Sequence, residues 1–506
     1  MGDTVLVDNK SFDSNIVIIY FECSLCAELE RFTIQVWEWN VMGSMEYEAE
    51  GMPPKKRKPF TTTRLILLSF LLAILIGTAF LCLPISSASG EWTEPVTALF
   101  TATTSVCVTG LVVVDTCTYW SLFGQIVILI LIQLGGLGIL SFTTLLMLAL
   151  GRRVTVRDRL LMMDAFDWND VGSSMRFLTR AFHVTLVIEA LGVCCYCFIF
   201  IPQFGFKGIW YSLFHSVSAF CNAGIDILGT DSLEAYVFHP FMNIVTITLT
   251  ILGGIGFIVW WDLGRVFCMY RNKEIRLSEI PKKCSVHTKI VLITTGTLII
   301  LGMLLLFLLE RDNRETIGDF SLPQKLMACL FQSVTTRTSG FAMISQKGLS
   351  DASVIICVIL MFIGGSPVST AGGVKTTTLA VAIIEAWSVI KGQNCAVVFQ
   401  RTIPVQTMRR GIMVLVIFFF LFVAASLALL ATSPGELSDI LFETASALGS
   451  AGITRDYTKS LTFIGQCIII ACMYCGRIGP VSLALAFRKT KEEMAGWYKE
   501  EDVMIG

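Results

Sequence analysis

The stretch Ser105-Val-Cys-Val-Thr-Gly-Leu111 has a counterpart at three later places in the chain. The counterparts are Ser218-Ala-Phe-Cys-Asn-Ala-Gly-Ile225, Thr335-Thr-Arg-Thr-Ser-Gly-Phe341 and Ser446-Ala-Leu-Gly-Ser-Ala-Gly-Ile453. Each contains a glycine followed by a large apolar residue. One such glycine would indicate only packing or a loop. Four of them at matching places indicate a repeated element with a shared function.

Long apolar runs flank each of these stretches. The long runs match the ~20 residues that cross a bilayer as helix, whereas the segments that lead to the glycines are too short to cross and return. We therefore expect an all-α integral membrane protein with four tandem helix–pore loop–helix repeats around one central pore. That architecture has eight spans and four re-entrant half-helices. The expected segments are 65–83, 93–109 and 122–150; 182–201, 209–222 and 241–270; 290–309, 322–338 and an interrupted 354–390; and 412–431, 437–450 and 463–487.

The composition agrees with a membrane protein. Of the 506 residues, 54% are hydrophobic and 15% are charged, whereas soluble domains are about 25% charged. The net charge of −1 gives no sign of a nucleic-acid partner. The four histidines lack metal-binding spacing, and most of the seventeen cysteines lie in apolar runs. These features argue against a soluble enzyme, a metal enzyme and a disulfide-bonded protein.

The distribution of charge predicts the orientation in the membrane. Basic residues gather before the first repeat, between repeats and after the last one, while the loops beside the short segments are mainly acidic. Positive loops stay in the cytoplasm, so both termini are expected there and the half-helices enter from outside. The predicted divisions are a cytoplasmic N-terminal segment of unassigned role (1–58), repeats at 59–160, 161–285, 286–405 and 406–490, and a cytoplasmic tail (491–506).

The four glycine stretches suggest an ion filter. Non-helical backbone at membrane depth is tolerated only where it is buried in protein or lines a water-filled path. A glycine there permits positive φ, so successive carbonyls can turn towards one axis and replace the water around a cation. The preceding half-helix would also point its negative C-terminal end at the ion.

These stretches resemble the Trk/Ktr/HKT superfamily of potassium transporters. Residues 101–115, TATTSVCVTGLVVVD, resemble its first pore loop, and 215–224, 331–340 and 443–452 resemble the other three. The similarity runs from about residue 60 to 490. It implies K+ as the transported ion, Na+ as a possible coupling or activating ion, and no organic cofactor in this chain. The implied ion ligands are Val108, Thr109, Gly110, Asn222, Ala223, Gly224, Thr338, Ser339, Gly340, Ser450, Ala451 and Gly452.

The resemblance also bears on selectivity. Plant members that favour sodium have serine at the first filter glycine, so Gly110 favours potassium. The filter stretches lack the second glycine of a TVGYG motif, so we expect selectivity looser than in a dedicated potassium channel.

Residues 364–378 interrupt the last apolar run of repeat three and form a candidate gate. Pro367 breaks a helix, and the resemblance implies an intramembrane loop that obstructs the pore, although Val368 stands where the Ktr pattern has glycine. Lys375 and Arg477 are intramembrane cations, which usually face a wet cavity or a partner. They could hold the closed state, or bind loop carbonyls. The gate prediction comprises Gly364, Gly365, Ser366, Pro367, Gly372, Gly373, Lys375 and Arg477.

Three other classes fit less well. A solute symporter with inverted repeats is disfavoured because all four units share one orientation. A redox enzyme using Cys23 and Cys26 lacks paired intramembrane histidines and any nucleotide motif. A voltage-gated channel would need an arginine-rich helix.

The prediction is thus a non-enzymatic, potassium-uptake subunit in the plasma membrane (the cell inner membrane). The alternative is a cation-coupled symporter with a sodium-preferring or weakly selective filter. The Ktr-like features imply a homodimer on a cytoplasmic RCK-type (KtrA/TrkA-like) regulatory ring that binds ATP or ADP.

Overall fold

The computed structural model describes residues 62–138, 171–229, 232–393 and 395–479. All of them belong to one compact unit, Phe60–Gly506. The predicted cytoplasmic segments 1–58 and 491–506 lie outside the described residues, as do parts of the predicted second helices of repeats one and four.

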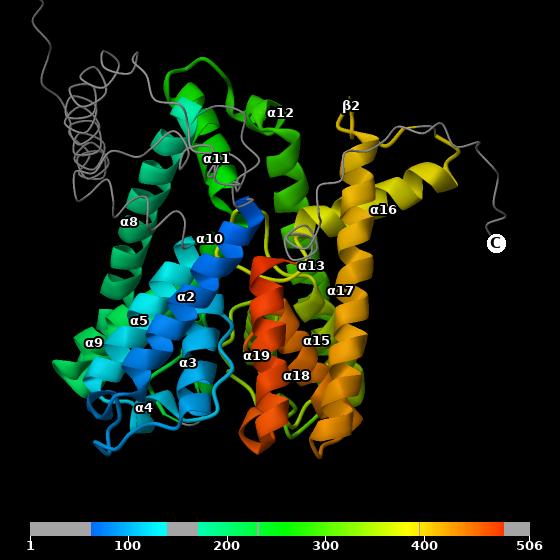
Figure 1. The fold of residues 1–506 in the computed structure, drawn as a ribbon. Helices are drawn as coiled ribbons and strands as arrows, with labels where there is room; N and C mark the ends of the chain where they lie inside the picture. Colours follow the sequence, from blue (N-terminus) through cyan, green and yellow to red (C-terminus); the bar gives the residue numbers. More distant parts are fainter. Residues whose placement is uncertain (1–61, 139–170, 230–231, 394, 480–506) are drawn as a thin grey trace, which may run out of the picture. The chain divides into compact units, whose positions relative to one another are not determined.

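Four long helices stand out in the described part of the chain (Figure 1). They are α2 (Thr62–Cys82), α8 (Val171–Phe204), α13 (Val286–Glu310) and α17 (Val405–Thr432). Each contains a stretch long and apolar enough to cross a membrane. Their apolar side chains face outwards in many places, as at Leu72, Phe198 and Phe420, which suits a helix surface solvated by lipid.

A short helix follows each long one. These four are α3 (Pro95–Cys107), α9 (Lys207–Cys221), α14 (Leu322–Thr335) and α18 (Leu437–Gly449). Proline near the first position begins α3 and α14, where its fixed φ suits a helix start and its missing N–H has no cost. The last turns of all four short helices are buried. They match the re-entrant segments expected from the sequence in position and length.

The helices after the glycine turns are more broken than expected. They are α5 (Leu122–Leu137), α10 (Pro240–Ile255) with α11 (Phe257–Arg271), α15 (Asp351–Phe362) with α16 (Thr376–Ile390), and α19 (Phe463–Ile478). The prediction of one run over 241–270 is wrong, because α10 and α11 meet at 95°. Gly256 forms the corner with φ +97, which a residue with a side chain adopts only under strain.

Length and composition identify four membrane-spanning helices among the described residues, or five if the bent pair counts as one span. Eight spans therefore remains a prediction. The break in repeat three covers the residues between Phe362 and Thr376, so the last three residues of the predicted loop 364–378 begin α16 instead.

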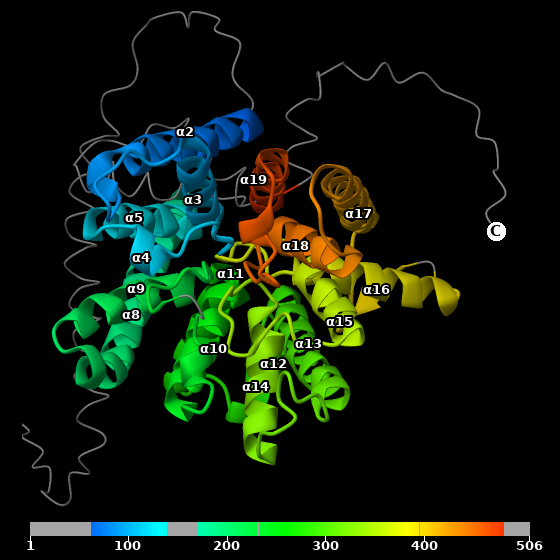
Figure 2. The same ribbon diagram turned by 90° about the horizontal axis from the view of Figure 1, so that it is seen from below.

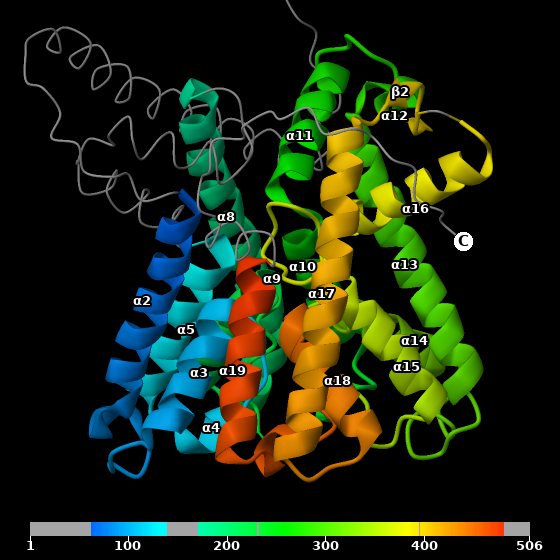
Figure 3. The ribbon, with the colours of Figure 1, turned by 45° about the vertical axis from the view of Figure 1, so that its right-hand side comes forward.

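The units pack in a ring, as Figure 2 shows. Each post-turn helix contacts the short helix of its own unit or the next: α5 contacts α3 and α9, α10 contacts α9 and α14, α15 contacts α18, and α19 contacts α18 and α3. The contact between α19 and α3 closes the ring between the last unit and the first. Figure 3 shows α19 lying between α3 and α17.

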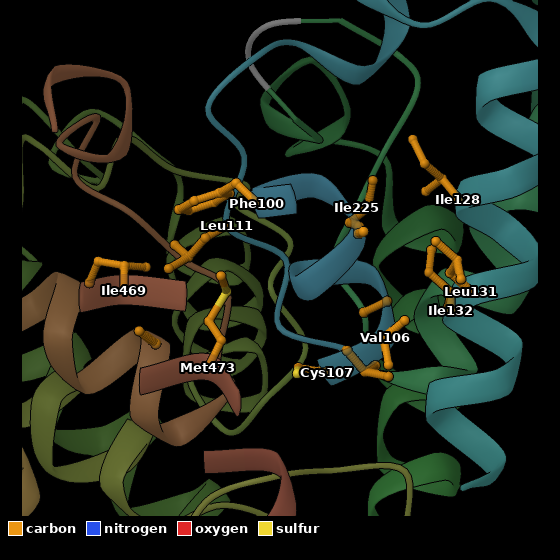
Figure 4. Close-up of a cluster of buried hydrophobic side chains, with 14 of the residues drawn as sticks. Phe100, Val106, Cys107, Leu111, Ile128, Leu131, Ile132, Ile225, Ile469 and Met473 are labelled. Carbon is orange, nitrogen blue, oxygen red and sulfur yellow. The ribbon is translucent and has the colours of Figure 1, made fainter. Parts of the chain in front are cut away.

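Apolar side chains fill this closing contact (Figure 4). Phe100 and Leu111 of the first unit lie towards Ile469 and Met473 of α19, while Val106 lies on the other side of α3 near Ile132. These side chains are buried. Lipid tails are as apolar as these side chains, so van der Waals packing in this contact, rather than transfer from water, holds the first and last units together.

Smaller elements complete the described chain. They are η1 (Pro84–Ser86), α4 (Thr116–Tyr119), η2 (Glu234–Tyr236), η3 (Leu277–Glu279), α12 (Ile280–Lys283), η4 (Thr458–Ser460) and an antiparallel hairpin of β1 (Val397–Val398) and β2 (Arg401–Thr402). In the hairpin Val397 pairs with Thr402, and Val398 with Arg401.

Candidate functional site: the glycine ring and the loop against it

All four short helices end in the same unusual backbone. Each predicted filter glycine has positive φ, between +61 and +108, and so does the residue two positions before it. Those earlier residues are Val108, Asn222, Thr338 and Ser450. Positive φ is costly for β-branched Val108 and Thr338. Strain of this kind persists only where surrounding structure imposes it, and it is concentrated at functional sites.

Hydrogen bonds to the last helical turn hold these turns in place. The residue before the glycine donates its N–H back to the helix in each unit: Thr109 to the Thr104 carbonyl at 2.9 Å, Ala223 to Ser218 at 2.8 Å, Ser339 to Thr335 at 3.0 Å and Ala451 to Ser446 at 2.8 Å. These bonds satisfy carbonyls that a helix end leaves unpaired. In two units a hydroxyl of the last helical turn also donates to the carbonyl just after the glycine: Ser218 to Ile225 at 2.7 Å and Thr335 to Phe341 at 2.5 Å.

The four glycines lie against one another in a closed ring. A Cβ on Gly110 would come within 2.6 Å of the Ala223 carbonyl oxygen and 3.1 Å of Gly452 Cα. A Cβ on Gly224 would lie 2.5 Å from the Ser339 oxygen, and one on Gly340 would lie 3.3 Å from the Ala451 oxygen. The ring closes because a Cβ on Gly452 would lie 2.9 Å from Gly110 Cα. Segments over 300 residues apart thus meet at one point, and only glycine fits there.

A cavity of about 260 Å³ opens on one side of the ring. Its wall contains the four glycines and several acidic side chains, among them Asp115, Asp226 and Asp456, with Lys459 as a cation. Burial raises the pKa of the Asp226 carboxyl to about 6, although hydrogen bonds from Ser232 and the Leu228 amide favour its charged form. The cavity forms a polar vestibule with an excess of carboxylates.

The predicted gate loop lies against the ends of two of the short helices, α9 and α18. The Thr370 hydroxyl donates to the Phe220 carbonyl of α9 at 3.2 Å. A Cβ on Gly372 would lie 2.5 Å from Ser450 Oγ, and one on Gly373 would lie 3.1 Å from the Gly449 oxygen. The loop also bonds to the corner after α10, because the Ser366 amide donates to the Gly254 carbonyl at 3.0 Å. The second and fourth units therefore both contact the loop.

Lys375 and Arg477 both donate to backbone carbonyls. Lys375 Nζ donates to the Ala371 oxygen at 2.8 Å, inside the loop. Arg477 donates to the Thr370 oxygen of the loop and to the Gly135 oxygen at the end of α5. These are the contacts expected if the two cations fix the loop. The Arg477 bonds connect the loop with the first and fourth units.

Glycines in the helices after the four turns pack closely against the short helices. Gly135 lies against the Val106 carbonyl, Gly136 against Cys221 and Gly253 against the Phe220 carbonyl, each leaving no room for a Cβ. Small residues let helices approach closely in a membrane.

Sequence reasoning missed several buried polar groups near the ring. Arg337 is 8% exposed and donates to the Thr295 and Gly364 carbonyls at 3.3 and 3.4 Å. Glu443 and Gln332 are buried in α18 and α14. The signal was present in the sequence, because each is a charged or amide residue in an otherwise apolar or small-residue stretch, which is costly without a partner.

Comparison with known proteins assigns the chain to a family. The family described as "TrkH: Cation transport protein" matches residues 32–498. The chain is 36% identical over 462 residues to the potassium/sodium uptake protein NtpJ of Enterococcus hirae, covering 90% of this chain and 99% of that protein. It is 37% identical over 451 residues to the Ktr system potassium uptake protein B of Bacillus subtilis, covering 88% of this chain and 97% of that protein.

A solved structure shares the fold. The potassium transporter TrkH from Vibrio parahaemolyticus matches with a TM-score of 0.65 and 16% identity over 89% of each chain. The predicted resemblance to the Trk/Ktr group is confirmed, and so is the prediction that the chain is no enzyme. This multi-pass helical membrane protein belongs to the TrkH family of cation transport proteins.

Proposed function

We propose that the chain takes up potassium across the plasma membrane through the glycine ring, with the ring as its selectivity filter. The observation that carries the proposal is the meeting of Gly110, Gly224, Gly340 and Gly452 at one point, each after a strained turn. The ligands are the twelve backbone positions predicted from the sequence. Similarity to two uptake proteins whose names include potassium supports the choice of ion.

The physical mechanism is replacement of water. Carbonyl oxygens released from helical bonding take over the hydration shell of a monovalent ion. The C-terminal ends of the four short helices add negative potential at the ring. The vestibule carboxylates raise the local cation concentration outside it. With both termini cytoplasmic, the vestibule faces outwards and the ion moves from the vestibule to the loop side.

The loop between Phe362 and Thr376 acts as the gate in this proposal. Its contacts with Phe220, Gly449 and Ser450 support a position in the ion path. Opening is a population shift of this loop, biased by a cytoplasmic nucleotide-binding ring and possible sodium activation. A homodimer with one pore in each protomer completes the proposed assembly. The name "Ktr system" of the Bacillus relative supports the existence of another component.

Growth of cells that lack potassium uptake tests the filter. We expect the wild-type chain to restore growth at low potassium, measured with and without sodium. Gly110→Ser should lose this rescue or shift uptake towards sodium, because Gly110 has φ +108 and its Cβ would meet the Ala223 oxygen. Unchanged potassium uptake by Gly110→Ser at equal abundance would reject the filter assignment.

A cation-coupled symporter with a sodium-preferring or weakly selective filter is the second candidate. The name of the Enterococcus relative includes both potassium and sodium. Uptake of radioactive sodium that equals rubidium uptake, or that is required for it in fixed proportion, would favour this candidate over selective potassium uptake.

A further inference from the structure

Behind two of the four filter turns, a buried polar side chain of the short helix is hydrogen-bonded to the chain that follows the glycine. We call each such hydrogen-bonded group a clasp. In the fourth unit, Glu443 of α18 lies nine residues before Gly452, and both of its carboxylate oxygens are bonded. The Thr454 hydroxyl donates to one oxygen at 2.7 Å, and the Thr458 hydroxyl donates to the other. Glu443 has no exposed surface. The helix before the filter is thus bonded to the chain that leaves it.

The third unit has the same arrangement with different chemistry. Gln332 of α14 lies eight residues before Gly340. The difference of one from the fourth unit arises because the turn of the third unit is one residue shorter. Its amide exchanges two hydrogen bonds with Gln346, at 2.6 and 3.1 Å. Gln346 follows Gly340 by six residues, as Thr458 follows Gly452. Gln332 and Gln346 are 1% and 5% exposed.

The first and second units differ at the matching helix position. Thr101 bonds to the Thr97 carbonyl of its own helix at 2.9 Å. His215 lies near the Tyr211 carbonyl, 2.8 Å from Nδ1, and its ring stacks with Phe341. In the described residues, side chains at this position bond to the outgoing chain only in units three and four. The clasp is therefore a property of half of the ring.

Each clasp includes a residue that lines the vestibule, and the clasps are therefore next to the proposed ion path. Thr454 and Gln346 both line the vestibule next to the glycines. Arg455 links the two clasped units, because it donates to the Gln346 carbonyl at 3.3 Å and pairs with Asp439 of α18 at 3.0 Å. A buried polar network that is fully bonded rigidifies its surroundings. Movement of either outgoing chain would break these hydrogen bonds.

We propose that Glu443 and Gln332 are positioning residues of the filter, which hold the backbone after Gly452 and Gly340 at the spacing that suits potassium. The inference rests on the proposed function. Neither side chain touches the ion; each acts through its partner in the outgoing chain. Loss of partners outside the first ligand shell commonly lowers affinity or activity about 10-fold or more.

The test compares two substitutions at Thr458, which lies in the short helix η4 outside the filter. Thr458→Val removes the hydroxyl that donates to Glu443 and keeps the shape, whereas Thr458→Ser keeps the hydroxyl. Rubidium and sodium uptake are measured in cells that lack potassium uptake, with the amount of protein in the membrane. We expect Thr458→Val to raise KM for rubidium about 10-fold, with lower rubidium-to-sodium preference. Thr458→Ser should restore both values.

Glu443→Gln and Gln332→Leu extend the test to the helix side of each clasp. Glu310→Gln is the matched control, because Glu310 is also buried and accepts bonds from the Ser350 and Thr316 hydroxyls, but at the end of α13. We expect Glu310→Gln to change protein abundance at most, with wild-type KM and ion preference.

The outcomes separate the two proposals. A wild-type chain that transports no potassium contradicts the proposed function itself. A transporting wild type, with Thr458→Val and Glu443→Gln present in the membrane at wild-type KM and ion preference, overturns the positioning role alone. If Glu443→Gln fails to accumulate, the comparison of Thr458→Val with Thr458→Ser still tests the positioning role.

Discussion

Two separate constraints, backbone angle and space, decide which positions of the proposed filter must be glycine. Gly224 and Gly205 have nearly equal φ, +61 and +59, yet a Cβ on Gly224 would meet the third unit while a Cβ on Gly205 would meet nothing within 4 Å. The sequence shows both as glycine and cannot tell them apart by type. Their difference lies entirely in what surrounds them.

This pair of glycines gives the first residue-scale prediction. Gly224→Ala and Gly205→Ala should each cost about 1–2 kcal/mol for the left-handed backbone. Only Gly224→Ala should also displace the neighbouring filter backbone, so we expect rubidium uptake to fall at least about tenfold. Gly205→Ala should transport normally. Equal uptake by the two variants, at equal abundance, would show that the ring needs no close approach at Gly224.

The second residue-scale prediction concerns external pH. The pKa of Asp226 is about 6 because burial disfavours its charge, so the carboxyl becomes neutral as the pH falls below that value. At about 10 Å through water a unit charge contributes about 0.4 kcal/mol, or about twofold in apparent affinity. We expect KM for rubidium to rise about twofold as external pH falls from 7.5 to 5.

Asp226→Asn should have the raised KM at pH 7.5 and lose the change with pH. Asp456→Asn is the control, because Asp456 lines the same vestibule but is exposed. That variant should keep the change between pH 7.5 and 5. A pH response that survives Asp226→Asn would assign the titration to another group.

At the scale of elements, two arginines, one from the third unit and one from the fourth, hold the loop after α15. Arg477 of α19 donates to Thr370 in the loop and to Gly135 at the end of α5, while Arg337 donates to Gly364 at the beginning of the loop. Val368 has φ +54 within it, a strained angle for a β-branched residue. A loop under strain and fastened by a few donors has the features of a two-state element.

Removing the Arg477 donors should free this loop. We expect Arg477→Gln to raise rubidium flux several-fold in proteoliposomes that contain this chain alone, because the loop loses its bond to α19 and the ion path loses a positive charge. Arg265→Gln is the control, since Arg265 also donates to a backbone carbonyl, that of Lys283, but away from the loop. Flux that stays at the wild-type level in Arg477→Gln would contradict a gating role for the loop.

At the scale of the whole molecule, the ring depends on the contact that joins its two ends. Ile469 is fully buried in the cluster between α19 and α3, whereas Ile464 of the same helix is 56% exposed. Ile469→Ala should lower the free energy of unfolding by about 2–4 kcal/mol through the cavity it leaves. Ile464→Ala should change it by no more than about 0.5 kcal/mol.

The stability of both isoleucine variants is measured as the thermal midpoint of unfolding of the purified protein in detergent. The same helix and the same substitution make the comparison a test of burial alone. Equal midpoints for the two variants would mean that the closing contact between the last and first units contributes little to stability.

The sequence by itself determined the class of the protein and the places of its four turns. Hydropathy along a run decides whether a helix can lie in lipid, and glycine and proline act on the backbone of their own residue, so both signals can be read locally. The positions of the short helices before each turn followed from such signals, whereas the family was predicted from the resemblance of the four glycine stretches to known pore loops. The number of spans stays a prediction.

The tertiary structure alone decided which groups meet. The corner at Gly256, the bond from Arg477 to Gly135 and the clasp between Glu443 and Thr458 join or redirect segments that no local pattern pairs. A buried donor must find an acceptor somewhere, but the sequence does not say where, because the partner is chosen by packing. The identity of the partners of Arg477 therefore appears only once the four units surround a common centre.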